Sequence, residues 1–173
     1  MPKQHACLAE VTVGAGGASS IIFSSISSTY TDLILKVSLR KDSNYTRRVL
    51  QLRFNGATSG YSDMMVNGSG SSVGGGGGLG GGVAIAMWDV PAALSTANTF
   101  SSVEIYIPNY RGSSQKAVSI DGAGEDNATQ AYMGLTAGLS NITSAISSIE
   151  LYTDQGGNFV QHSTVSLYGI TNS

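Results

Sequence analysis

The chain has 173 residues, of which 23 are glycine, and 12% are charged, about half of the ~25% usual in soluble domains. The net charge of −2 excludes a charge-driven disordered chain, and clustered glycines exclude a collagen-like helix. A Ser-, Gly- and Thr-rich composition argues against a coiled coil, and no run approaches the ~18 apolar residues of a membrane span. These exclusions leave one globular domain.

The first thirteen residues, MPKQHACLAEVTV, lack the apolar core of ~7–15 residues that a secretory signal requires. Cys7 is the only cysteine, so packing and not an intrachain disulfide must hold the fold. We expect residues 1–17 to form a short N-terminal arm and residues 18–173 to form the domain.

Alternation of apolar and polar residues, the pattern of half-buried strands, dominates the domain. It is clearest over residues 33–40, 50–54, 103–107, 149–152 and 165–168. Weaker candidates are 9–13, 20–26, 83–88, 117–121 and 131–137, with a helical turn as an alternative inside 129–148. Short strands separated by turn signals such as Asn55-Gly56 predict an all-β, antiparallel, jelly-roll-like β-sandwich.

Residues 68–82 read GSGSSVGGGGGLGGG and have almost no side chains to bury. We expect a long glycine-rich surface loop inside the sandwich. A phosphate-binding reading fails, because a Walker loop ends in Gly-Lys-Ser/Thr and Gly82 is followed by Val83.

Charge is unevenly distributed along the chain. Residues 1–60 contain seven basic and three acidic residues (+4), and residues 61–173 contain two basic and eight acidic (−6). Arg40, Lys41, Arg47 and Arg48 are candidates for docking onto an acidic protein surface, with ordinary solvation of a strand face as the alternative. A pI of about 5.5 and few neighbouring aromatics argue against nucleic-acid binding.

Tyrosines recur at strand ends and on the polar faces of the predicted strands. Tyrosine gives a large contact area at low entropy cost, so Tyr106, Tyr110, Tyr152 and Tyr168 are candidates for a subunit interface. A sugar-binding groove and aromatics flanking the core are the alternatives.

We expect no enzyme, no metal and no cofactor. The two histidines and the lone cysteine have no metal-ligand spacing, and the acidic segment 121–126 lacks the spacing of a calcium loop. A glycosidase would need a close carboxylate pair, for which Glu104 and Glu150 are the candidates. Strand-face charges that discourage edge aggregation are the preferred reading of these two residues.

Four segments, taken as a set, resemble a known family. They are SSISSTYTDLILKVSLR, LQLRFNGATSGYSDMMVNGSGSS, NTFSSVEIYIPNY and GNFVQHSTVSLYGI, within residues 18–171. They are similar to virion structural proteins of tailed phages of the cyanophage and marine-phage type. The resemblance implies a jelly-roll or related β-sandwich module of a capsid decoration protein or tail fibre, and carries no catalytic residues.

From this resemblance we expect a capsid cement protein on the outer shell of a virion, made in the host cytoplasm. It would bind the major capsid protein, bridge capsid subunits and self-associate, with a homotrimer favoured. We expect no membrane or nucleic-acid partner. The alternative is a tail-fibre module that recognises host glycans. A chain with the module and a short N-terminal segment fits a cement protein better than a long fibre.

Overall fold

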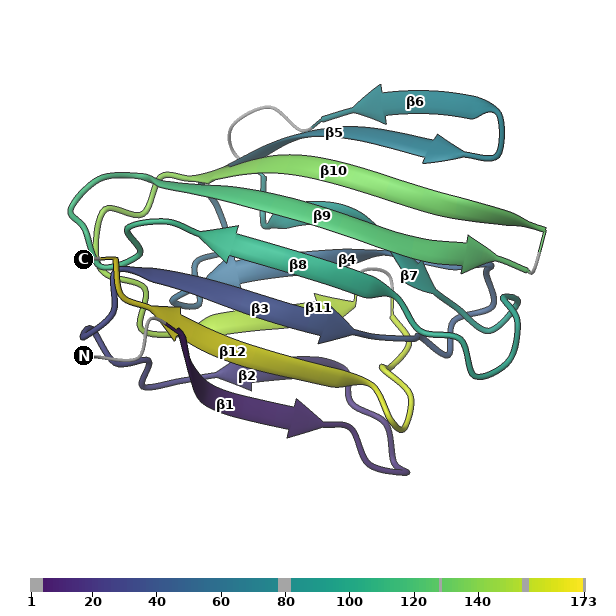
Figure 1. The fold of residues 1–173 in the computed structure, drawn as a ribbon, viewed down its shortest axis with the longest axis horizontal. Helices are drawn as coiled ribbons and strands as arrows, with labels where there is room; N and C mark the ends of the chain where they lie inside the picture. The colour runs from purple at the N-terminus through teal and green to yellow at the C-terminus, as the bar shows by residue number, and fades with distance from the viewer. Residues whose placement is uncertain (1–4, 78–81, 128, 154–155, 173) are drawn as a thin grey trace.

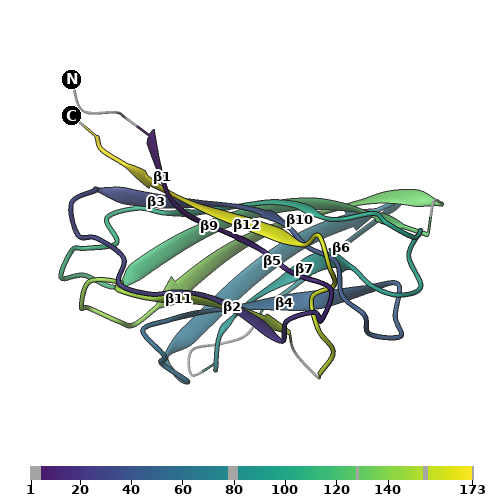
Figure 2. The same ribbon diagram turned by 90° about the horizontal axis from the view of Figure 1, so that it is seen from below.

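A computed structural model describes residues 5–77, 82–127, 129–153 and 156–172. Twelve strands and no helix are present among these residues, arranged in two antiparallel sheets (Figure 1). Seen from below, the two sheets lie as two layers (Figure 2). The prediction of an all-β antiparallel sandwich is confirmed.

The larger sheet has eight strands in the order β1-β12-β3-β8-β9-β10-β5-β6. Their bounds are β1 His5–Thr12, β12 Thr164–Ile170, β3 Asp32–Ser38, β8 Ser102–Ile107, β9 Lys116–Asp126, β10 Gln130–Ser140, β5 Tyr61–Ser69 and β6 Ser72–Gly76. The smaller sheet has four strands in the order β2-β11-β4-β7. Their bounds are β2 Ser20–Phe23, β11 Ile149–Thr153, β4 Arg47–Phe54 and β7 Ile85–Pro91.

The core lies between the sheets and is made by the apolar set of each alternating strand. Leu33 and Leu35 of β3, Leu52 of β4 and Ile105 of β8 are fully buried there. Burying a side chain of this size stabilises the fold by about 1.5–3 kcal/mol, so these positions fix which face of each strand points inward.

Two segments expected as an arm and as a loop contain strands, although residues 9–13 of the arm were also a weaker strand candidate. Residues 5–12 of the expected N-terminal arm form β1, which pairs along β12 at one edge of the larger sheet. Residues 72–76 of the expected glycine-rich loop form β6, which pairs with β5 at the other edge. Ladder hydrogen bonds come from the backbone, so glycines pair without any side-chain pattern. Residues 1–4 and 78–81 lie outside the described residues.

Two antiparallel hairpins extend the larger sheet on one side. One hairpin is β9 with β10 and the other is β5 with β6, and β10 pairs with β5 to join them. Strand β7 of the smaller sheet packs against β10, β9 and β5. Residues 130–140, where a helical turn was the alternative, are therefore a strand.

Candidate functional site

Two of the four basic residues expected to dock on a partner are buried. Lys41 is fully buried, and its Nζ donates a hydrogen bond to the carbonyl oxygen of Val49. Arg40 is also buried. The docking hypothesis is wrong for both residues. Strand β3 ends at Ser38, so the alternation that would place Arg40 on the polar face stops before it.

Arg40 instead holds a loop in place. Its guanidinium donates to the carbonyl oxygens of Ser95 (3.1 Å), Thr96 (2.7 Å) and Thr99 (3.2 Å). From β9, the Glu125 carboxylate accepts from the Thr96 backbone N–H (2.9 Å) and from the Thr99 hydroxyl (2.9 Å). Burial lowers the pKa of Arg40, and the charge of Glu125 raises it. Glu125, in the acidic segment 121–126, thus has a structural role.

Arg47 and Arg48, at the start of β4, are half-buried and lie over tyrosine rings. The guanidinium carbon is 3.5 Å from the ring centroid of Tyr132 for Arg47, and 3.4 Å from that of Tyr45 for Arg48. Tyr45 and Leu94 are each about half exposed, and the Leu94 N–H donates to the Tyr45 carbonyl (2.9 Å). Tyr45, Arg48 and Leu94 together form an exposed patch, called here the Tyr45 patch.

The four tyrosines expected at one interface do not share a surface. Tyr110 is fully buried, with its hydroxyl donating to the Ser27 carbonyl, so it is not an interface residue. Tyr152 lies on the smaller sheet, where Arg53 is 4.1 Å from its ring centroid. Only Tyr106 and Tyr168 lie on one face, the outer face of the larger sheet, in register with either side of Ile34.

The outer face of β1, β12, β3 and β8 is called here the polar half. Tyr106 donates its hydroxyl hydrogen bond to Asp32 (2.8 Å), and Ser166 donates to Glu10 (3.2 Å). Lys36 of β3 forms an ion pair with Glu104 opposite it on β8. These six polar side chains thus have partners within the chain.

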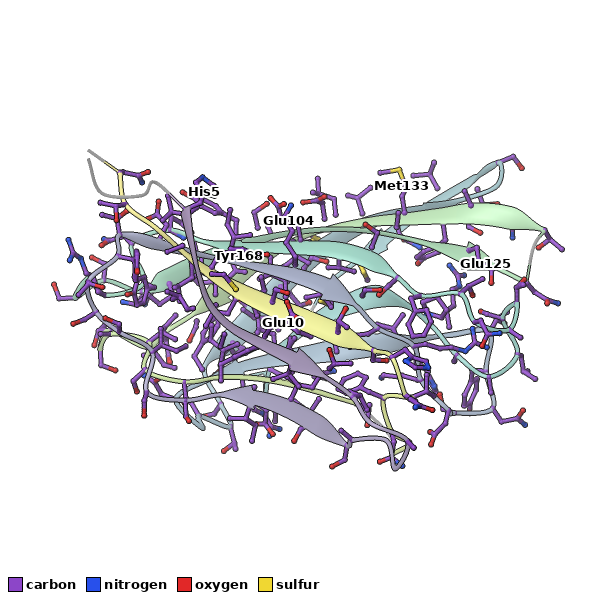
Figure 3. All side chains as sticks on the ribbon, turned by 60° about the horizontal axis from the view of Figure 1, so that its bottom comes forward. His5, Glu10, Glu104, Glu125, Met133 and Tyr168 are labelled. Carbon is purple, nitrogen blue, oxygen red and sulfur yellow. The ribbon has the colours of Figure 1, made fainter. Side chains whose placement is uncertain are left out.

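A shallow depression of about 360 Å³ lies on the polar half. It is lined by His5, Ile34, Lys36, Glu104 and Tyr168. Figure 3 shows His5, Tyr168 and Glu104 over one part of the larger sheet and Met133 over another part of it. An aromatic ring, an aliphatic side chain and a Lys–Glu pair give this depression both apolar and hydrogen-bonding groups, as small-ligand sites have.

The outer face of β9, β10, β5 and β6 is called here the apolar half. On β10, Met133, Leu135 and Leu139 point to solvent, whereas Thr136 and Ser140 point inward. Six large apolar side chains of this half are between 40% and 82% exposed: Met64, Val66, Val73, Met133, Leu135 and Leu139. Single exposed apolar residues are normal, but a contiguous set this large marks an interaction surface.

On β10 the large apolar side chains face outward and mostly small residues face inward, and near Gly138 this has a steric cause. A Cβ placed on Gly138 would lie 2.7 Å from the Ile85 side chain of β7, and Ile85 is fully buried. At Gly138 the space beneath β10 therefore has no room for a side chain, whereas Tyr132, nearer the start of the strand, is fully buried on the same inner face. In the sequence, the signal for this face is the alternation of Met133, Leu135 and Leu139 with small residues.

Strand β9 gives the apolar half a border of small side chains. Its outward residues are Ala117, Ser119, Asp121 and Ala123. Asp121 is in register with Leu135 on one side and with Glu104 on the other, where the polar half begins. The large residues of β10 and β5 thus form a ridge beside a strip of small residues.

The carboxylates proposed as a glycosidase pair are not brought together. Glu104 is on the larger sheet beside Lys36, and Glu150 is on the smaller sheet in register with Arg53. Each has a cation as its cross-strand neighbour, consistent with a strand-face charge. Among the described residues, no group of three or more metal-ligating side chains gathers.

Comparisons with known protein families, curated proteins and solved structures found no match. Within the described ranges, no helix is long and apolar enough to cross a bilayer.

Proposed function

We propose that this chain is a structural protein of a tailed-phage virion, a cement protein that binds the outer capsid shell and bridges major capsid subunits. Cementing is mass action: a protein that binds only the assembled shell stabilises it by its binding free energy. Many weak sites on one shell then reinforce one another through effective concentration.

The observation that carries this proposal is the apolar half. Met64, Val66, Met133 and Leu135 are half or more exposed on a regular sheet, where water gives them no favourable contact. An assembly that covers this surface gains about 25 cal/mol for each Å² of apolar area removed from water. A role as a subunit of a larger assembly accounts for such a surface.

The strand order supports the jelly-roll part of the expectation. With the β9–β10 and β5–β6 hairpins set aside, the remaining strands lie in the orders β1-β12-β3-β8 and β2-β11-β4-β7. Successive strands then mostly alternate between two four-stranded sheets, as in two Greek keys. The apolar half belongs to the two added hairpins, so it is an addition to the sandwich.

We place the capsid contact at the Tyr45 patch. Tyr and Arg are the residue types enriched where binding energy concentrates, and Arg48 is already ordered over the Tyr45 ring. The patch keeps one residue of the basic docking set, Arg48, at the surface. An acidic capsid surface would complement its charge.

Binding to purified expanded capsids tests the proposal. We expect saturable binding and a higher thermal midpoint of the capsid in the presence of the protein. The double variant Tyr45→Ala, Arg48→Ala should weaken binding by on the order of 100-fold, since two such residues together contribute about 2–3 kcal/mol. Arg111→Ala, an exposed arginine elsewhere, is the matched control. No saturable binding by the wild type would refute the proposal.

The depression on the polar half favours a second candidate function, recognition of host glycans by a tail-fibre module. Tyr168 offers a ring face, and Lys36 with Glu104 offers donors and acceptors for hydroxyl groups. A glycan array decides this candidate. Binding that is lost in Tyr168→Ala and kept in Tyr152→Ala would support it, and an array without signal would reject it.

A further inference from the structure

We propose that the apolar half is the seat of a second copy of this chain, with two molecules packed sheet to sheet about a two-fold axis. This inference rests on the proposed structural function and names the partner of the surface that carries it. Three observations favour a second copy over another occupant: the area of the surface, its charge and its relief.

The area of the apolar half is close to what a stable dimer needs. Six large side chains, each at least 40% exposed, present on the order of 600 Å² of surface to solvent. This area is at the upper end of the range for the largest exposed apolar patch of a monomeric protein. Standard interfaces bury about 800 Å² on each partner. Ala131 and Ala137 of β10 are also exposed on the apolar half and bring its area near the ~800 Å² that each partner of a standard interface buries.

The charge of the apolar half favours an identical partner. Residues 61–173 carry two basic and eight acidic residues, a net −6, so charged residues of this part of the chain that meet their counterparts in a second copy would mostly be like-charged. On the outer face of β10 and β5, the residues that face solvent, among them Met64, Val66, Met133 and Leu135, carry no charge. Two copies meet there without placing like charges opposite each other.

The relief of this face is self-complementary. The ridge of Met133, Leu135 and Leu139 lies beside the strip of Ala117, Ser119 and Ala123 on β9. In a two-fold interface, residue i of one copy contacts residue j of the other, and j contacts i in return. The ridge of each copy thus packs over Ala117, Ser119 and Ala123 of its partner. Asp121 lies within this strip, in register with Leu135, and is the one charged residue among the outward side chains of β9 named above. Facing sheets pack about 10 Å apart with interdigitated side chains, which this relief allows.

Sedimentation of matched lysine variants tests the pairing. Leu135→Lys places a charge in the proposed interface, and Ile22→Lys places one on β2 of the smaller sheet. The two positions are 51% and 57% exposed, and each is in register with a carboxylate, Asp121 for Leu135 and Glu150 for Ile22. Each substitution therefore places a lysine at a similarly exposed strand position with a carboxylate in register.

We expect wild type and Ile22→Lys to sediment as dimers at micromolar concentration. In Leu135→Lys the dissociation constant of the dimer should rise by about 100-fold or more, because a lysine is desolvated in each copy. Circular dichroism and the thermal midpoint show whether each variant is folded, and Met133→Lys replaces Leu135→Lys if the latter is not. A monomeric or trimeric wild type, or a dimer that survives the folded variant, would overturn the pairing.

The capsid assay separates failure of the pairing from failure of the function. If the wild type is a monomer yet binds capsids saturably, the second copy is rejected and the cement proposal stands. If the wild type is a dimer that Leu135→Lys dissociates but no capsid is bound, the pairing stands and the cement proposal is rejected.

Discussion

The polar and apolar halves of the larger sheet share one continuous hydrogen-bonded ladder but differ in how their outer side chains are satisfied. In the polar half, Lys36 pairs with Glu104 and Tyr106 donates to Asp32. In the apolar half, Met133 and its neighbours have solvent where a partner would be. The named polar side chains of the first half have partners within the chain, whereas the large apolar side chains of the second half face solvent.

This difference follows the architecture. The polar half belongs to strands that, with the smaller sheet, make a complete two-layer sandwich, and the apolar half belongs to two added hairpins. Val118 and Ile120 of β9 belong to the core, so the hairpins contribute to the fold through their inner face. Under the proposed function, their outer face is the surface that serves assembly.

The largest expected effect is the difference in stability between a substitution on the inner face of the larger sheet and one on its outer face. Leu35→Ala, on the inner face of β3, should lower the free energy of unfolding by about 3 kcal/mol, because Leu35 is fully buried. Leu135→Ala, on the outer face of β10, should lower it by less than about 1 kcal/mol at protein concentrations where the chain is a monomer. Urea denaturation measures both. Similar losses would contradict the division between fold and assembly.

The next effect concerns a buried charge beside the polar half. Arg40→Met should lower the free energy of unfolding by about 2–3 kcal/mol, because Glu125 and the carbonyls of Ser95, Thr96 and Thr99 lose their partner. Thermal unfolding provides the measurement.

Arg111→Met is the control for Arg40→Met. Arg111 is exposed and donates to the Ser28 carbonyl (3.1 Å), so its loss should change stability by less than about 0.5 kcal/mol. Equal effects of the two substitutions would mean that the Arg40 contacts do not hold the loop.

A smaller effect depends on pH. The hydrogen bond to Asp32, with burial, raises the pKa of Tyr106 above its ordinary value of about 10. The folded state holds this proton more tightly, so the stabilisation is complete below about pH 10 and is lost as the pH rises through the raised pKa. Burial raises the pKa of Tyr61 and Tyr110 in the same direction, and lowers that of Lys116, which acts oppositely.

Tyr106→Phe should therefore be less stable than the wild type by about 1 kcal/mol near pH 8, and the difference should shrink as the pH rises above 10. Urea denaturation at several pH values measures it. With Asp32→Asn as background, the same substitution should show a weaker pH dependence. A difference that grows with pH would show the assigned sign to be wrong.

The smallest effect is expected for the exposed ion pair of the polar half. A double-mutant cycle of Lys36→Ala and Glu104→Ala should give a coupling below about 1 kcal/mol, because the Lys36 side chain is 59% exposed and that of Glu104 is 34% exposed, so solvent screens the pair. The coupling should fall further in 1 M salt, where screening is within ~3 Å. A coupling above 2 kcal/mol that resists salt would mean that the polar half is also covered by a partner.

Much of the sandwich could be predicted because alternation reports burial on one side of a strand. Residues 33–38, 50–54 and 103–107 behave as expected. Alternation stops where a strand stops, which is why Arg40 and Lys41 were assigned to the surface and are buried.

The apolar half could not be predicted from the same pattern. The residues 131–137 indicate a strand, but alternation does not say which set faces inward. At Gly138 the inward set is restricted by Ile85, which is distant in sequence and close in space. Glycines 74–76 show no alternation of apolar and polar residues, so the sequence pattern does not indicate β6. The backbone pairing with β5 identifies this strand.

The close approach of Gly138 to Ile85 also bears on misfolding. A shift of one residue in the pairing of β9 with β10 would turn Met133, Leu135 and Leu139 toward β7. Hydrophobicity alone would favour that shift, yet the position of Gly138 has no room for a Cβ and opposes it. Steric exclusion at this one position thus contributes to the choice of register. Ile85→Ala, by widening the gap, would make the shifted register accessible and turn a uniquely folded sheet into a mixture of two.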